Sequence, residues 1–484
     1  MITAPASAPA AQPSHGWVSD ESPAGLPGRT RFRRLLAAIC ALGLSHCQPA
    51  PSPPNLLLFV TDTLRADALS CYGGPAHTPN ICSLAERGVL FEAAHANGPW
   101  TPPSAVSIFT GNYPTAYANL GESGESYWVS DEEVLLAEAL RARGYDVRFG
   151  SGSPIVAKTN ALQGFERLPE PTRAVDASFA GVAGSAQYLR DHDGTAFFLL
   201  EWVMDPHAPY EAPGVVDRLD VDRSRLRQPL DFYTRLGHRL PMSLRDHAPR
   251  MSDYELEVLR RLYLAEVERV DEKFGDLMRA LDAAELRPST YVVFTSDHGE
   301  GFGEHGAFLH GVSFYDELSR VPLIVAGPGI ARGKRVHKSV SLVDLMPTLR
   351  DLMAVECLND PQGRSLAPLL RGGPEDEAPS HAHYLSSPSG LTRGVDALID
   401  GNHKLIAKLD GSTELYDLAE DPGERRNLAA ERPDVVLRMR AVLDRIRRGK
   451  DERRRRNFAL QTEKDRLDVH EQVLEELREL GYVE

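Results

Sequence analysis

Cysteine is scarce in this chain of 484 residues, which contains only five. They stand at positions 40, 47, 71, 82 and 357, and no two of them form the CxxC pair of a zinc-binding knot. A disulfide framework is therefore excluded as the main source of stability. Cys71 and Cys82 could still pair in an oxidising compartment, whereas Cys357 has no obvious partner.

Positive charge is also in short supply. The chain has 54 Lys and Arg against 69 Asp and Glu, which gives a formal net charge of −15. Proteins that bind nucleic acid normally present a basic surface, so we expect no nucleic-acid partner, and small ligands remain open. The apolar fraction of 42% and the charged fraction of 25% are ordinary for a globular protein. The length predicts a large domain with a smaller one.

The apolar run from Leu35 to Leu44 is too short to cross a bilayer. It follows three arginines at positions 31, 33 and 34, as the core of a signal peptide does. Residues 44–47 (LSHC) resemble a bacterial lipoprotein cleavage site, although His46 stands where a small residue is usual. We expect export to the periplasm or cell surface, with a lipid anchor through Cys47 as one option. The alternative is a helix on a disordered extension.

Apolar runs alternate with helix-like segments along the chain, which predicts an α/β fold with a mostly parallel sheet covered on both faces. The expected strands are 55–60, 196–204, 291–295 and 321–326, and the expected helices are 132–143 and 254–281. We divide the chain into an N-terminal export segment and Pro-rich linker (1–54), a large domain (55–370), a small C-terminal domain (371–450) and a charged helical tail (451–484).

Ligand-type residues follow three of the expected strands. Asp62 follows the first, Asp205 and His207 follow the second, and Asp297 and His298 follow the third. The carboxyl ends of parallel strands meet at one edge of a sheet, so these groups can converge although they are far apart in sequence. Taken singly, each Asp is more often a helix cap or turn residue. Three such strand ends together predict a site.

The third strand continues into the run 296–311, SDHGEGFGEHGAFLHG, which holds three His, two Glu and five Gly. Such a run makes a poor core segment, because buried unpaired charge is costly and Gly weakens regular structure. We interpret it as a site-forming loop. Asp and His together suit a borderline divalent ion such as Mn or Zn, whereas an all-oxygen cage would suit Ca or Mg.

The segment 100–111, WTPPSAVSIFTG, predicts a helix that begins close to Thr101. Pro102 and Pro103 favour the first turn of a helix, and residues 105–109 can continue it. The Thr101 hydroxyl would then lie among free backbone N–H groups, where a tetrahedral oxyanion can bind. The alternative is that Thr101 only caps the helix.

Six segments in order resemble the successive motifs of sulfatases. They are NLLLFVTDTLRAD (55–67), TPPS (101–104), DPHAPY (205–210), the run 296–311, VPLIVAGP (321–328) and ELYDLAEDPGERRNL (414–428). The resemblance implies an alkaline phosphatase-like α/β/α sandwich with a mixed, mostly parallel sheet and a smaller C-terminal α+β domain. It implies one divalent ion, Mn, Zn or Ca, and an ester substrate. The implied metal ligands are Asp62, Thr101, Asp297 and His298, and the implied catalytic residues are Thr101 as nucleophile, His207 and His310.

The chain departs from sulfatases at the nucleophile. Active sulfatases carry CxPSR, whose Cys is oxidised to formylglycine, but here Thr101 replaces the Cys and Ala105 replaces the Arg. Thr cannot become formylglycine. The pattern resembles phosphonate monoester hydrolases, which share an Asp, Asp, His metal set. It also resembles lipoteichoic-acid-synthase-like phosphotransferases and nucleotide pyrophosphatases, which use a metal-bound Thr.

These departures favour phosphoester over sulfate chemistry. A Thr alkoxide on a divalent ion can attack phosphorus, whereas a sulfo-threonine has no second hydroxyl to expel the sulfate. Asp205 and His305, with His310, could supply a second metal site, although one metal is expected because no full second ligand set is evident. The alternative function is a catalytically degenerate sulfatase fold that binds sulfated or phosphorylated glycans at the cell surface.

Overall fold

The described part of the chain begins after the expected export segment. The computed structural model describes residues 52–121, 124–169, 182–210, 219–236, 251–311, 313–356, 360–376, 383–387, 395–408 and 410–460. The expectations for residues 1–51, including the Cys47 anchor, and for 461–484 lie outside them. Among the described residues, no helix is both long and apolar enough to cross a membrane.

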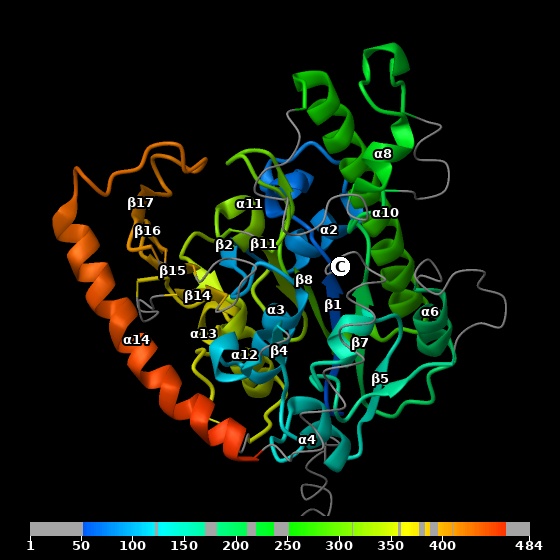
Figure 1. Ribbon diagram of the computed structural model, residues 1–484. Coiled ribbons are helices and arrows are strands. Elements are labelled where there is room, and N and C mark those ends of the chain that lie inside the picture. The colour runs from blue at the N-terminus through cyan, green and yellow to red at the C-terminus, as the bar shows by residue number, and fades with distance from the viewer. Residues whose placement is uncertain are drawn as a thin grey trace, which may run out of the picture. The chain divides into compact units, whose positions relative to one another are not determined.

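A nine-stranded sheet forms the centre of the molecule (Figure 1). Its strand order is β12-β2-β11-β8-β1-β7-β5-β6, and β13 also pairs with β2. β11 runs antiparallel to both of its neighbours, and the other pairs are parallel. The strands are β1 (Asn55–Thr61), β2 (Val89–His95), β5 (Asp146–Phe149), β6 (Glu166–Arg167), β7 (Phe197–Val203), β8 (Thr290–Ser296), β11 (Arg320–Ala326), β12 (Lys334–Val336) and β13 (Val340–Ser341). The expected mixed, mostly parallel sheet and its four predicted strands are confirmed.

Helices cover both faces of this sheet, because its central strands are apolar on both sides. In β1, Leu56, Leu58 and Val60 belong to one core, and Leu57 and Phe59 belong to the other. Figure 1 shows α3 (Thr101–Thr110) and α12 (Leu345–Leu352) on one side, and α6 (Ala183–Arg190) and α10 (Asp253–Ala283) on the other. The remaining helices of four or more residues are α2 (Pro79–Arg87), α4 (Leu136–Ala142), α5 (Pro154–Ala157), α8 (Leu230–Thr234), α11 (Asp316–Ser319), α13 (Ala367–Leu370) and α14 (Pro433–Leu460).

Both helices predicted from the sequence are present, but the predicted first residue is close to the observed one only for α10. α10 begins after Ser252, whose hydroxyl accepts from Glu255 N while the Glu255 carboxylate accepts from Ser252 N. α4 begins at Leu136, four residues later than the predicted start at Glu132. The reason is local. The Glu138 carboxylate accepts from Leu135 N at 2.9 Å, and this contact makes Leu135 the N-cap of α4.

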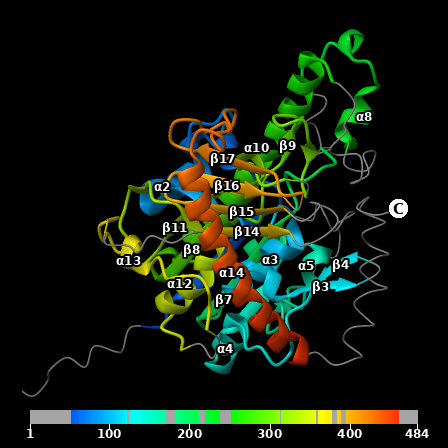
Figure 2. The ribbon, with the colours of Figure 1, turned by 60° about the vertical axis from the view of Figure 1, so that its left-hand side comes forward.

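A four-stranded antiparallel sheet and α14 make up the C-terminal part. Its strands are β14 (His383–Ser387), β15 (Val395–Asp400), β16 (His403–Ala407) and β17 (Thr413–Asp417). α14 lies across this sheet (Figure 2), and Val435, Met439 and Leu443 share a core with Leu398 and Leu405. Two further hairpins are β3 (Ala118–Gly121) with β4 (Gly124–Tyr127), and β9 (Gly301–Phe302) with β10 (Phe308–Leu309). The smaller C-terminal sheet domain is thus present, while the boundaries at 370 and 450 stay predictions.

A buried lysine fixes the C-terminal sheet to the large domain. Lys404 on β16 is fully buried, and its Nζ lies 2.9 Å from Asp316 Oδ1 and 3.0 Å from Glu424 Oε1. Nζ also donates to Ser319 Oγ at 3.2 Å. Burial lowers the pKa of Lys404, but Asp316 and Glu424 outweigh it and raise that pKa above its usual value. The lysine is therefore charged in the folded protein.

We predict that Lys404→Met lowers the free energy of unfolding by about 3–5 kcal/mol, because the buried Glu424 and the partly buried Asp316 lose their counter-charge. Lys408→Met is the matched control, since Lys408 is half exposed and its pair with Glu414 should contribute less than about 1 kcal/mol. Denaturant unfolding of the three proteins measures both effects. Equal losses in the two variants would contradict the role of Lys404.

Candidate functional site

The register of the central strands brings the candidate metal ligands together. β1 and β8 are parallel neighbours with Thr61 opposite Ser296, so Asp62 and Asp297 leave the same edge of the sheet side by side. One ligand atom each from Asp62, Asp297 and His298 lie within 4.8 Å of one another, and all three residues are buried. The ends of β1 and β8 therefore converge as the sequence predicted, and they supply the three candidate ligands.

Backbone contacts orient these side chains. Asp297 Oδ1 accepts from Thr63 N at 3.2 Å and from His298 N at 2.8 Å, which leaves Oδ2 directed into the cluster. His298 Nδ1 lies 2.9 Å from the Gly299 carbonyl, which can only accept, so Nδ1 carries the proton. Nε2 then faces Asp297 Oδ2 at 3.3 Å. Thr63 has a positive φ of 58°, an uncommon conformation that accompanies this sharp turn beside the site.

The electrostatics of the cluster favour a bound cation. Asp62 Oδ1 and Asp297 Oδ2 are buried and have no hydrogen-bond partner. Burial raises the pKa of Asp297 to about 8, and burial together with the Asp297 charge raises the pKa of Asp62 well above its usual value. Two buried carboxylates with unsatisfied oxygens are costly unless a positive charge compensates them. Two carboxylates and an imidazole nitrogen fit a divalent ion.

Thr101 is the first residue of α3, and its side chain reaches the same cluster. Its Oγ1 lies 3.4 Å from Asp62 Oδ2 and 3.4 Å from His298 Nε2, and the residue is buried. The first turn offers fewer free amides than the sequence suggested. Pro102 and Pro103 have no N–H, and Ser104 N bonds to the Trp100 carbonyl at 3.4 Å. An oxyanion here would therefore depend less on helix amides than expected.

Two further histidines lie beside the cluster. The His310 ring is 4.7 Å from that of His298 and 5.0 Å from that of His207, measured between centroids. Burial, helped by the nearby His310, lowers the pKa of His207 to about 3, so its imidazole is neutral at ordinary pH. The structure thus brings His207 and His310 to the three candidate ligands and Thr101.

Glu300 is a site residue that the sequence analysis missed. It is fully buried, its Oε1 lies 2.9 Å from His310 Nδ1, and its Oε2 accepts from the Tyr210 hydroxyl at 3.4 Å. The contact fixes the His310 ring and leaves Nε2 on the side away from Glu300. The signal available in the sequence was an acidic residue two positions after His298 in a glycine-rich run.

The two residues suggested for a second metal have other partners. Asp205 forms an ion pair with Lys273 on α10, and Arg269 Nε lies 3.8 Å from its Oδ1. His305 lies 2.7 Å from Glu317 and stacks on the Tyr315 ring at 3.6 Å. These contacts do not bring Asp205 and His305 together. Within the described ranges, no second group of three acidic, Cys or His residues could hold a metal.

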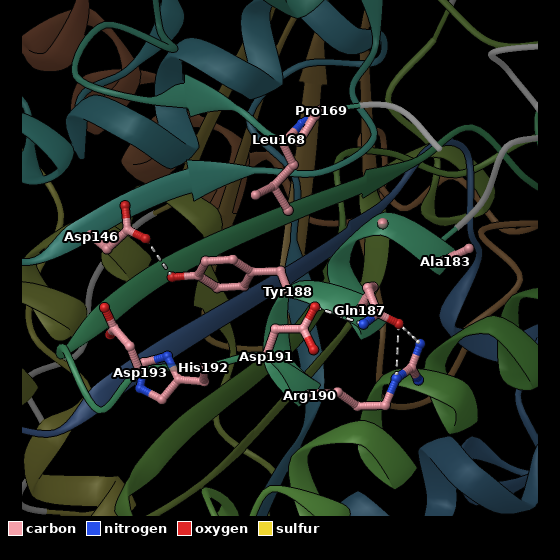
Figure 3. Close-up of a pocket in the computed structure, with 11 residues that line it drawn as sticks. Asp146, Leu168, Pro169, Ala183, Gln187, Tyr188, Arg190, Asp191, His192 and Asp193 are labelled. Carbon is pink, nitrogen blue, oxygen red and sulfur yellow. Dashed lines mark hydrogen bonds between the residues drawn. The ribbon is translucent and has the colours of Figure 1, made fainter. Parts of the chain in front are cut away.

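A cavity of about 610 Å³ lies beside β5 and α6. Figure 3 shows Tyr188 donating to Asp146 in its wall, with Gln187, Arg190 and Asp191 linked to one another. None of the candidate site residues lines this cavity. It is therefore separate from the cluster at the carboxyl edge of the sheet.

The sheet, its helical layers and the small C-terminal sheet define a hydrolase of the alkaline phosphatase superfamily. The sulfatase family model matches residues 54–355, and a model described as the C-terminal part of N-sulphoglucosamine sulphohydrolase matches residues 303–449. The chain therefore belongs to the sulfatase family, whose members are ester hydrolases that use a divalent metal.

Its relatives and structural neighbours include several ester hydrolases. The Delta 4,5-hexuronate-2-O-sulfatase of Bacteroides thetaiotaomicron is 27% identical, over 85% of this chain and 93% of the relative. The arylsulfatase K of Xenopus laevis is 32% identical over 84% of each chain. A solved 2-O GAG sulfatase is 25% identical, with a TM-score of 0.69 over 84% of this chain and 94% of the other. A phosphonate monoester hydrolase of Agrobacterium radiobacter shares the fold at 22% identity, with a TM-score of 0.64 over 82% and 96%.

We predict that the wild-type protein binds one equivalent of Mn²⁺ or Zn²⁺ and that Asp297→Asn abolishes this binding, because the amide removes both charge and a ligand oxygen. His305→Gln should keep the full equivalent if the metal lies only between Asp62, Asp297 and His298. Elemental analysis after dialysis against each metal measures both. Metal retained by Asp297→Asn, or lost from His305→Gln, would contradict the assignment.

Proposed function

We propose that this protein is a metal-dependent ester hydrolase that uses Thr101 as its nucleophile and prefers phosphorus esters to sulfate esters. The observation that carries the proposal is the position of the Thr101 hydroxyl, 3.4 Å from both Asp62 and His298. A hydroxyl so close to two metal ligands can itself become a ligand. This chain has no cysteine at that position, so formylglycine chemistry is not open to it.

Each residue of the cluster has its own role in the proposed reaction. Asp62, Asp297 and His298 would hold one ion, which is Mn, Zn or Ca. Such an ion supplies positive charge that favours the ionised form of a nearby hydroxyl and neutralises the ester. Thr101 Oγ1 forms a bond to phosphorus while the ester oxygen leaves. His207 and His310 would steady the transferred group, and His310 would pass the proton released by Thr101 to the leaving oxygen. Water then breaks the phospho-threonine bond, or an acceptor alcohol does.

The preference for phosphorus follows from this last step. Water attacks a phosphoryl group directly, so a phospho-threonine can be resolved without help from a second hydroxyl. A formylglycine hydrate expels its sulfate by elimination, which needs a second hydroxyl that Thr101 does not have. The phosphonate monoester hydrolase at 22% identity supports the fold alone.

The class of substrate is supported by the relatives. One relative is named for a hexuronate 2-O-sulfate, and one structural neighbour was solved with D-glucosamine-2-N,6-O-disulfate. We propose a small-molecule or glycan ester, met by an exported protein in the periplasm or at the cell surface and anchored through Cys47.

The competing function is a degenerate sulfatase fold that binds sulfated or phosphorylated glycans without turnover. The replacement of the motif arginine by Ala105 favours it, because Ala105 cannot hold an anion. The buried cluster argues against it, since two carboxylates with unsatisfied oxygens destabilise a fold that has no ion to bind.

We predict that Thr101→Ala lowers kcat by about a thousandfold or more while the metal content stays largely intact, because the nucleophile is lost but Asp62, Asp297 and His298 remain to hold the ion. Thr101→Ser keeps the hydroxyl and should keep most of the activity. Rates on an aryl sulfate, a phosphate monoester, a phosphodiester and a phosphonate monoester measure the preference. Undiminished turnover by Thr101→Ala would rule out the nucleophile, and faster turnover of the sulfate would rule out the preference. Ligand binding without turnover would support the degenerate fold.

We predict that Glu300→Gln slows esters of poorly acidic alcohols about 10–100-fold and nitrophenyl esters much less, because His310 loses the partner that orients it toward the leaving oxygen. The measurement is kcat for a series of leaving groups. Glu304→Gln is the control, since Glu304 pairs with Arg65 instead of His310. A uniform loss across all leaving groups would show that Glu300 acts only in folding.

A further inference from the structure

Two thiols lie close together on another part of the surface. Cys71 lies on a 3-10 helix, η2 (Ser70–Tyr72), and Cys82 lies on α2. Both are partly buried free thiols, and the hydroxyl of Ser70, the residue before Cys71, lies 3.3 Å from Cys82 Sγ. Both cysteines line one surface cavity of about 350 Å³, together with Glu86, Lys334 and Arg335. A small reactant can therefore reach both sulfurs in a cavity that carries charges of both signs.

The segment between the two cysteines is held firmly by hydrogen bonds. Gly74 N donates to the Leu69 carbonyl at 2.8 Å, in a turn where a Cβ at Gly74 would lie 2.2 Å from a backbone oxygen. Ser70 N donates to Thr78 Oγ1 at 3.0 Å, and Thr78 N donates to Ser70 Oγ at 3.3 Å. These paired contacts keep η2 against the start of α2. The two cysteines are thus held in fixed positions relative to each other.

The two sulfurs differ in their surroundings. Cys82 Sγ lies 3.3 Å from Ser70 Oγ and 3.6 Å from Thr78 Oγ1. The two hydroxyls are also hydrogen-bonded to each other at 2.9 Å, so one of them donates to its neighbour and the other is left to donate to Cys82. The hydrogen bond from Cys71, followed by those hydroxyls, lowers the pKa of Cys82 to about 6. The same bond and burial raise the pKa of Cys71. Cys82 is therefore the more readily ionised thiol of the two.

We propose that Cys71 and Cys82 are a redox pair that closes to an intramolecular disulfide by exchange with a disulfide oxidant. The Cys82 thiolate attacks one sulfur of a disulfide such as oxidised glutathione, forming a mixed disulfide and releasing one glutathione thiolate. Cys71 then loses its proton and attacks the Cys82 sulfur, which releases the second glutathione. Two thiols are oxidised and one glutathione disulfide is reduced to two thiols.

The test is peptide mapping of the full chain after incubation with oxidised glutathione and alkylation of the remaining thiols. The expected result is one cross-linked pair of peptides, carrying Cys71 and Cys82 and lighter than the reduced pair by two hydrogens. Cys71→Ser should trap a glutathione adduct on Cys82, whereas Cys82→Ser should leave Cys71 unmodified. The double variant Cys71→Ser/Cys82→Ser serves as the blank for the other cysteines.

Three outcomes would overturn the proposal. They are full alkylation of both wild-type cysteines, a bond from either cysteine to a different one, and adducts of equal yield in the two single variants. Neither thiol belongs to the candidate catalytic cluster, so these outcomes leave the proposed function of Thr101 untouched. Melting curves of the variants confirm that each has folded before it is mapped.

Discussion

The parallel pairing of β1 with β8 is the constraint on which the candidate site depends. Each strand is apolar on both faces, so both are fixed in the centre of the sheet, and Thr61 lies opposite Ser296. A shift of one residue in this pairing would exchange the residues of β1 between the two cores. The same shift would separate Asp62 from Asp297. The packing of the cores and the geometry of the cluster are therefore set by one register.

The cluster favours a compensating positive charge, because burial makes its carboxylate charges unfavourable. Backbone N–H groups satisfy Asp297 Oδ1, while Oδ2 and Asp62 Oδ1 stay without hydrogen bonds. His298 presents Nε2 as an acceptor because the Gly299 carbonyl holds the proton on Nδ1. Three acceptors face one another, and a cation resolves this arrangement. Stabilising interactions elsewhere in the fold offset the unfavourable free energy of holding these acceptors together.

The sequence predicted those features that depend on neighbouring residues. The apolar runs placed the strands, the ligand-type residues marked the strand ends, and Pro102 with Pro103 placed the start of α3. Partners that come from distant elements could not be predicted in this way. Lys273 on α10 pairs with Asp205, and Glu317 pairs with His305, because tertiary packing brings them together. Glu300 was visible in its loop, but its contact with His310 depends on the hairpin of β9 and β10.

The charge of the site bears on the kind of ester that it can accept. Ala105 stands where the sulfatase motif CxPSR has its arginine, so this chain lacks that positive charge. His207 is neutral, because burial holds its pKa at about 3. A divalent ion would then be the main positive charge facing two carboxylates. A substrate with two negative charges would be poorly compensated in such a site. Under the proposed function, such a site would suit an ester with a single negative charge, which a phosphodiester, a phosphonate monoester and a sulfate ester all carry.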